Sequence, residues 1–128
     1  MALVLQLTGW YLDLSVCMRI DSSVSSSAVS SEFARGHNIL RNLNRTGDVV
    51  TFFTCSGPVT VPCRDGRYIS SLCFRLSDIG EYDVLLGSDW LDACQPTYGS
   101  GMIVGPSSVE RILPHGHTWI PFNNVSAS

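Results

Sequence analysis

The chain has 128 residues, of which 45% are hydrophobic and 15% are charged. This length suits one domain with its own core, and this balance excludes an intrinsically disordered chain. The 8 basic residues are scattered through a chain of net charge −3. They do not form the Lys and Arg cluster that a phosphate backbone requires, so we expect no nucleic-acid partner.

The cysteines and the N-terminal segment bear on the compartment. Five cysteines without a Cys-x-x-Cys pair favour reduced thiols over a disulfide framework. The apolar start, residues 1–5, lacks a basic leader, and Asp13 precedes any clean cleavage site, so we expect no secretory signal. No apolar run is long enough to span a bilayer. We therefore expect an intracellular, cytoplasmic protein without a membrane partner.

Residues 3–21 alternate between apolar and polar side chains. Leu3, Leu5 and Leu7 predict a first strand, and Thr8-Gly9 offers a turn. From residue 10 to residue 20 every even-numbered side chain is apolar. This predicts a second strand with that set, which begins at Trp10, on one face of a sheet. The alternation stops at Asp21, an acid that such a strand can hold rigidly.

A serine-rich run, residues 22–31, follows the second strand. Its composition also fits a flexible linker, but apolar residues recur through it and just beyond it: Val24, Ala28, Val29 and Phe33. Ser30 or Ser31 is placed to cap a short helical turn over residues 32–35. We favour an ordered loop and a short strand over a linker.

The middle of the chain predicts hairpins. Residues 38–43 and 49–53 flank a turn at Thr46-Gly47-Asp48, and residues 59–63 and 68–76 flank a second turn that contains Asp65-Gly66. Short strands with turns at close spacing indicate an all-β barrel or sandwich.

The second half adds one more strand and a helix before the pattern becomes irregular. The strand spans residues 82–86 and stops at Gly87. Ser88 or Asp89 then caps a short helix near residues 89–94, which Pro96 prevents from continuing. A further short strand is expected at residues 102–104.

Two stretches carry a family resemblance. Residues 20–34 read Ile-Asp-Ser-Ser-Val-Ser-Ser-Ser-Ala-Val-Ser-Ser-Glu-Phe-Ala, and residues 82–91 read Tyr-Asp-Val-Leu-Leu-Gly-Ser-Asp-Trp-Leu. The first is similar to the retroelement protease pattern of an apolar strand, Asp-Ser/Thr-Gly, a small residue, then Ser/Thr and an apolar pair. The second resembles the Tyr-Asp-Val-Ile-Leu-Gly-x-Asp-Trp-Leu signature of gypsy-type retrotransposon proteases. The resemblance covers about residues 3–96 of a single domain, 1–128, and leaves residues 97–128 unassigned.

The resemblance implies an all-β, retropepsin-like half-barrel that works as a homodimer on a peptide or protein substrate, without cofactor or metal. Asp21 of each chain would be catalytic, and the two carboxyls would share one proton and activate water. Ser22 would brace the two active loops, and the strand with Leu86 and Gly87 would support them. Thr46, Gly47 and Asp48 would form the tip of a flap that closes over substrate.

Ser23 departs from the family, which has glycine at this position. A serine adds a side chain beside the catalytic pair, and it would be strained if the backbone there had a positive φ. The alternative to an active aspartic endopeptidase is therefore an inactive retroelement-derived domain that dimerises or binds peptides. A serine hydrolase is weaker, because the sequence around Ser88 lacks the second glycine of a nucleophile elbow. His115-Gly116-His117 lacks a third metal ligand.

Overall fold

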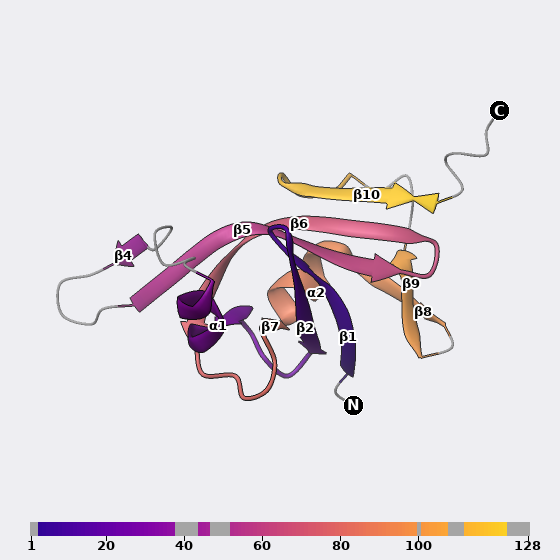
Figure 1. Cartoon of the computed structure of the whole chain (residues 1–128). Coiled ribbons are helices and arrows are strands. Elements are labelled where there is room, and N and C mark those ends of the chain that lie inside the picture. Colours follow the sequence, from indigo (N-terminus) through magenta and orange to yellow (C-terminus); the bar gives the residue numbers. More distant parts are fainter. Residues whose placement is uncertain (1–2, 38–43, 47–51, 100, 108–111, 123–128) are drawn as a thin grey trace.

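Ten strands and two short helices make up the part of the chain that this computed structural model describes, residues 3–37, 44–46, 52–99, 101–107 and 112–122. Figure 1 labels them in chain order. They are β1 (Val4–Tyr11), β2 (Leu14–Asp21), β3 (Ala28–Ser30), α1 (Ser31–Gly36), β4 (Asn44–Thr46), β5 (Phe52–Cys63), β6 (Gly66–Ser77), β7 (Val84–Leu86), α2 (Ser88–Cys94), β8 (Pro96–Gly99), β9 (Met102–Pro106) and β10 (His117–Pro121).

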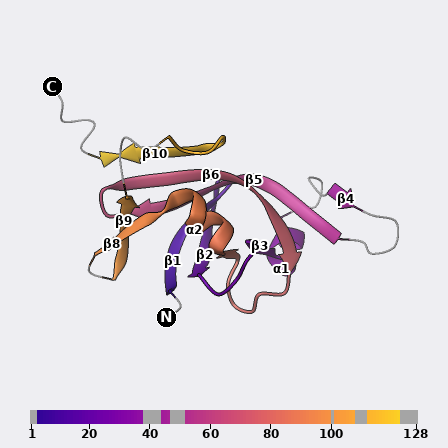
Figure 2. The same ribbon diagram turned by 180° about the vertical axis from the view of Figure 1, so that it is seen from behind.

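Eight of these strands form one sheet in the order β10-β6-β3-β7-β2-β1-β5-β4, and β8 pairs with β9 alone. An additional pairing between β5 and β6 closes the run β6-β3-β7-β2-β1-β5 into a ring. The long β5–β6 hairpin crosses the molecule, with β10 on one side and β1, β2 and α2 on the other (Figures 1 and 2). The all-β, barrel-like fold expected from the sequence is therefore confirmed.

The β1–β2 hairpin turns later than the sequence predicts. Thr8 and Gly9 lie inside β1, and the turn is at Leu12–Asp13. Trp10, predicted on the apolar face, is 43% exposed, while Tyr11 is fully buried. The prediction was wrong because Leu12 adopts a left-handed conformation with φ of 55°, which the sequence does not signal.

Tertiary contacts hold this turn in place. The Leu12 N–H donates to the Pro58 carbonyl at 2.9 Å. Gly9 lies inside β1 rather than in the turn. Glycine is needed there because a Cβ would overlap the Thr60 carbonyl oxygen and the Met18 side chain. Beyond the turn the predicted alternation holds, since Val16, Met18 and Ile20 are buried.

The serine-rich run is ordered, as expected. It contains β3 and leads into α1, whose N-cap Ser30 accepts a hydrogen bond from the Phe33 N–H at 3.2 Å. The fold therefore has two helices: α1, and α2, which is the helix expected near residues 89–94. The cap predicted for α2 was wrong: its N-cap is Gly87, and no side chain caps it.

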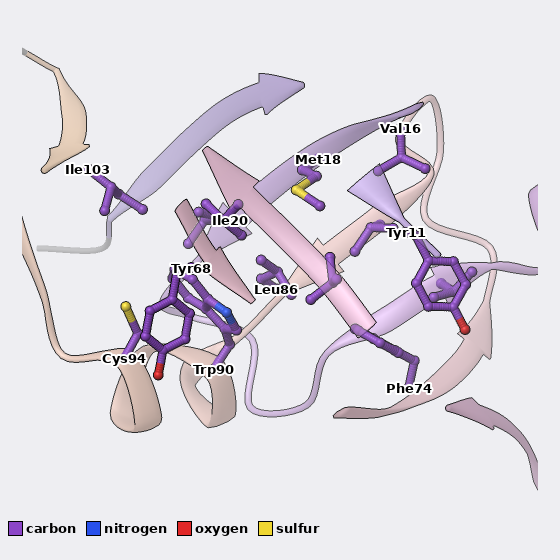
Figure 3. Close-up of a cluster of buried hydrophobic side chains, with 14 of the residues drawn as sticks. Tyr11, Val16, Met18, Ile20, Tyr68, Phe74, Leu86, Trp90, Cys94 and Ile103 are labelled. Atoms are coloured by element: carbon purple, nitrogen blue, oxygen red, sulfur yellow. The ribbon is translucent and has the colours of Figure 1, made fainter. Parts of the chain in front are cut away.

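The residues after 96, unassigned from the sequence, add strands to the same fold. β8 and β9 form a hairpin, and β10 pairs antiparallel with the start of β6, where Trp119 lies opposite Tyr68. The core gathers side chains from both halves of the chain (Figure 3). Trp90 of α2 is fully buried, stacks edge-on against Tyr68 at 5.7 Å and donates its indole N–H to the Ser70 hydroxyl at 3.0 Å. This packing fixes α2 beneath the sheet.

Candidate functional site

Asp21 is the last residue of β2, and neighbouring strands fix it on both sides. It pairs with Val4 of β1, and the preceding Ile20 pairs in parallel with Leu86 of β7. The Asp21 side chain is 10% exposed and lines a cleft of about 360 Å³. The predicted catalytic acid is therefore rigidly placed at the edge of a cavity.

Both oxygens of the Asp21 carboxylate accept hydrogen bonds. Oδ1 accepts from the Ser23 N–H at 3.0 Å and from the Ser23 hydroxyl at 2.6 Å. Oδ2 accepts from Nε and Nη2 of Arg19 at 3.3 and 3.2 Å. Hydrogen bonds to a carboxylate stabilise its ionised form. The two Ser23 bonds, and then Arg19, therefore lower the pKa of Asp21 below its ordinary value, although burial acts in the opposite direction.

Ser23 is not strained in this loop. Apart from glycines, the described residues with a positive φ are Leu12 and Gln95. The serine at this position thus fits the backbone without a left-handed conformation, and its hydroxyl donates a hydrogen bond to Asp21. The backbone-strain expectation is not met, and the effect of Ser23 is on the carboxylate and on the space beside it.

Ser22 connects the loop after Asp21 to Leu3, just before β1. Its N–H donates to the Leu3 carbonyl at 2.9 Å, and its hydroxyl accepts from the Leu3 N–H at 2.7 Å. A hydroxyl that accepts one bond still carries a donor, so Ser22 keeps a proton for a further partner. The brace across two chains stays a prediction.

The segment around Gly87 crosses the loop after Asp21. The Ser88 N–H donates to the Val24 carbonyl at 2.7 Å, and a Cβ on Gly87 would overlap that same carbonyl oxygen. Gly87 is therefore required for this close approach. The supporting role expected for Leu86 and Gly87 stays a prediction.

Hydrogen bonds between Ser27 and Asp89 hold the loop after Asp21 against the segment around Gly87. The fully buried Ser27 hydroxyl donates to Asp89 Oδ1 at 2.6 Å and accepts from the Gly87 N–H at 3.0 Å. The Ser27 N–H donates to Asp89 Oδ2 at 3.0 Å. A single carboxylate thus joins the loop after Asp21 to the start of α2.

The fold of this chain matches a solved structure, the retroviral protease-like domain of Ddi1 from Leishmania major. The TM-score is 0.55 at 15% sequence identity, over 84% of this chain and 98% of that one. The fold is retropepsin-like. No protein-family model matches the sequence, and the search of curated proteins gave no match.

The predicted flap lies only partly within the described residues of this retropepsin-like fold. Thr46 ends β4 and pairs antiparallel with Phe52 of β5. Gly47 and Asp48 lie outside the described residues. Figure 1 places β4 at the far end of the β5–β6 hairpin, away from β8 and β9. The role of Thr46, Gly47 and Asp48 as a flap tip stays a prediction.

The rival sites gain no support from the described geometry. The Ser88 hydroxyl donates to the Ser25 carbonyl at 3.5 Å, and Nδ1 of His117 lies 3.1 Å from the Tyr68 hydroxyl. Within the described ranges, no three His, Cys, Asp or Glu side chains are grouped to hold a metal ion. No helix in those ranges is long and apolar enough to cross a membrane.

Sequence reasoning missed Arg19, Tyr82, Ser27 and Asp89. Ser27 and Asp89 were inside the two recognised motifs, so the signal for their contact was present. Arg19 had a weaker signal: the family pattern has an apolar strand before the aspartate, and here a charged residue stands two positions before it. Its contact with the Tyr82 ring, 5.6 Å from the guanidinium carbon to the ring centroid, depends on the fold.

Proposed function

We propose that this chain is one half of a homodimeric aspartic endopeptidase in which Asp21 activates water. The observation that carries the proposal is the placement of Asp21: it ends a central strand of a retropepsin-like fold, and its carboxyl lines a cleft. The resemblance of residues 82–91 to gypsy-type proteases supports a retroelement origin.

The proposed chemistry needs a second chain. Two Asp21 carboxyls brought close together cannot both ionise, so one of them keeps a proton. The ionised carboxylate takes a proton from water as the water attacks the peptide carbonyl, and the protonated carboxyl donates to the carbonyl oxygen. The N–H and O–H of Ser23 orient the carboxylate through Oδ1.

Exposed apolar side chains on β1, β8 and β9 support a second copy as the partner. Val4, Tyr98 and Met102 are 43, 48 and 42% exposed. The start of β1, the end of β2 and the β8–β9 turn lie at the same end of the molecule (Figures 1 and 2). Between β1 and β9 lies an apolar recess of about 160 Å³, lined in part by Leu5, Leu7 and Met102. Exposed apolar groups of this kind favour protein contact.

The second candidate is an inactive domain that dimerises or binds peptides. The specific observation that favours it is the Arg19–Asp21 ion pair, with N···O of 3.2 Å. An ion pair with a cation favours the ionised form of a carboxylate. The proposed mechanism instead needs one of the two Asp21 carboxyls of the dimer to be protonated.

Sedimentation and inhibitor sensitivity test the proposal together. The peptidase account predicts a dimer at tens of micromolar protein, in the ordinary range of a specific interface. It also predicts cleavage of a denatured protein mixture at about pH 5 that a transition-state-mimicking aspartic protease inhibitor stops. A monomer at every pH would contradict the two-aspartate mechanism. A dimer without inhibitor-sensitive cleavage would favour the inactive module.

A further inference from the structure

Arg19 holds the second oxygen of Asp21 in an imperfect ion pair. Its Nε and Nη2 both point to Oδ2, at 3.3 and 3.2 Å, whereas strong charge-assisted bonds measure about 2.7–2.9 Å. Two donors that converge on one oxygen do not form the parallel, two-oxygen fork that guanidinium and carboxylate prefer. A second carboxylate with room to form that fork can therefore compete with Asp21.

Arg19 is also accessible from the cleft. Its side chain is 34% exposed, it lines the cavity next to Asp21, and it lies over the Tyr82 ring. A guanidinium carries more N–H donors than the two that Asp21 accepts. A peptide in the cleft would meet this cation beside the reacting group.

The other charged side chains of the cleft that the structure describes form hydrogen bonds to main-chain groups. Arg75 Nη2 donates to the Ser26 carbonyl at 3.3 Å, and Asp78 Oδ1 accepts from the Gly80 N–H at 3.2 Å. Among the cations of this cleft, Arg19 is the one that contacts the carboxylate of Asp21, and it also contacts Tyr82. An incoming anion that binds Arg19 therefore acts directly on Asp21.

We propose that Arg19 makes this cleft selective for peptides that present a carboxylate, which takes the guanidinium from Asp21 and so releases the Asp21 carboxyl for chemistry. The release of Asp21 for chemistry rests on the proposed peptidase function. The binding selectivity does not, and it is the part that the experiment measures first.

The probe is a set of short, fluorescently labelled peptide pools of degenerate sequence that differ at one feature. One pool has a central Glu and blocked ends, a second has Gln there and blocked ends, and a third has Gln and a free C-terminal carboxylate. Affinity is measured by fluorescence anisotropy with the full chain and with Asp21→Asn, Arg19→Leu, Arg19→Gln and Arg67→Gln. Arg67 is a matched control because it is an exposed arginine of β6 that lies far from the cleft. It is eight residues, or roughly 26 Å along the strand, from Arg75, which lines the cleft.

The inference predicts that the Glu pool binds about fivefold more tightly than the blocked Gln pool, the upper range for an exposed ion pair. Arg19→Leu and Arg19→Gln should abolish the preference, and Arg67→Gln should keep it. Asp21→Asn should increase it about another fivefold, because the internal competitor loses its charge. If the pool with the free C-terminus binds more tightly than both blocked pools, the carboxylate that Arg19 binds is the C-terminal carboxylate of the peptide.

Equal binding of all three pools to the full chain would overturn the inference, as would a preference that survives in both Arg19 variants. Each variant is first checked for the wild-type circular-dichroism spectrum, and two Arg19 replacements guard against one that fails to fold. Because Asp21→Asn has no catalytic carboxyl, a selective Asp21→Asn protein would uphold the inference even if the wild type cleaves nothing. Peptide cleavage by a wild type that binds all three pools equally would support the proposed function and contradict this inference alone.

Discussion

Ser27→Ala tests whether the crossing behind the active loop stabilises the fold. The substitution removes one oxygen and leaves the shape of the buried site almost unchanged. It deletes the bond that Ser27 donates to Asp89 Oδ1 at 2.6 Å and the bond that it accepts from the Gly87 N–H at 3.0 Å. We expect a clear loss of stability. The two lost hydrogen bonds contribute to it unequally.

The Gly87 N–H accounts for most of the expected cost. Gly87 is buried, so its N–H would lose its partner away from water, which costs about 1–3 kcal/mol. Asp89 is exposed, so water replaces the lost donor on its carboxylate at little cost. We therefore expect about 1–3 kcal/mol in total, or a fall in Tm of about 4–11 °C for a chain of this length.

The assay is thermal unfolding followed by circular dichroism, with Ser25→Ala as the matched control. Ser25 is an exposed serine of the same loop, and its replacement should change stability by less than about 0.5 kcal/mol. If Ser27→Ala unfolds at the temperature of the Ser25→Ala control, the Gly87 N–H finds another partner and the argument fails.

Three further results are expected. Ser23→Gly removes the 2.6 Å bond to Asp21 and should raise peptide cleavage while stability shifts by only about 1 kcal/mol; a wild type that is already as fast would show that the loop tolerates the side chain. Because the pKa of Asp21 lies below its ordinary 3.8 in the folded chain, its ionised form stabilises the fold above that pH, and this contribution is lost as pH falls through the lowered pKa. Urea unfolding at about pH 6 and about pH 2 should therefore show a smaller acid loss in Asp21→Asn than in wild type, and an equal loss would count against the lowered pKa. Burial raises the pKa of Cys63 to about 12, so at about pH 8 a thiol reagent should label the exposed Cys17 and Cys73 while Cys63 reacts only on unfolding; rapid labelling of Cys63 in the native state would contradict its burial.

The sequence predicted the parts of this fold that depend on local pattern. The alternation from Leu14 to Ile20 identified the buried face of β2, and Asp65-Gly66 located the β5–β6 turn. The turn at Leu12–Asp13 could not be read in the same way, because a leucine with positive φ carries no turn signal. It is held by a hydrogen bond to Pro58, a residue far along the chain.

The candidate site divides in the same way. Asp21 and Gly87 were predicted as site residues because each lies in a recognisable motif. Arg19 was overlooked because a polar residue between Met18 and Ile20 fits the outward face of an alternating strand. Alternation along β2 does place Arg19 and Asp21 on the same face of the strand, but only the fold brings Tyr82 against the guanidinium. The hydrogen bonds to the carboxylate therefore come partly from the motif, through Ser23, and partly from Arg19 outside it.

The central claim is that the Asp21 carboxyl performs peptide hydrolysis. The most direct measurement is the initial rate at which the wild-type chain and Asp21→Asn cleave a denatured protein mixture at about pH 5, with new peptide ends counted by mass spectrometry. Asparagine keeps the shape of the side chain and removes the ionisable group that acid–base catalysis needs. The account predicts cleavage by the wild type and none by a folded Asp21→Asn protein. Equal rates for the two proteins would contradict it.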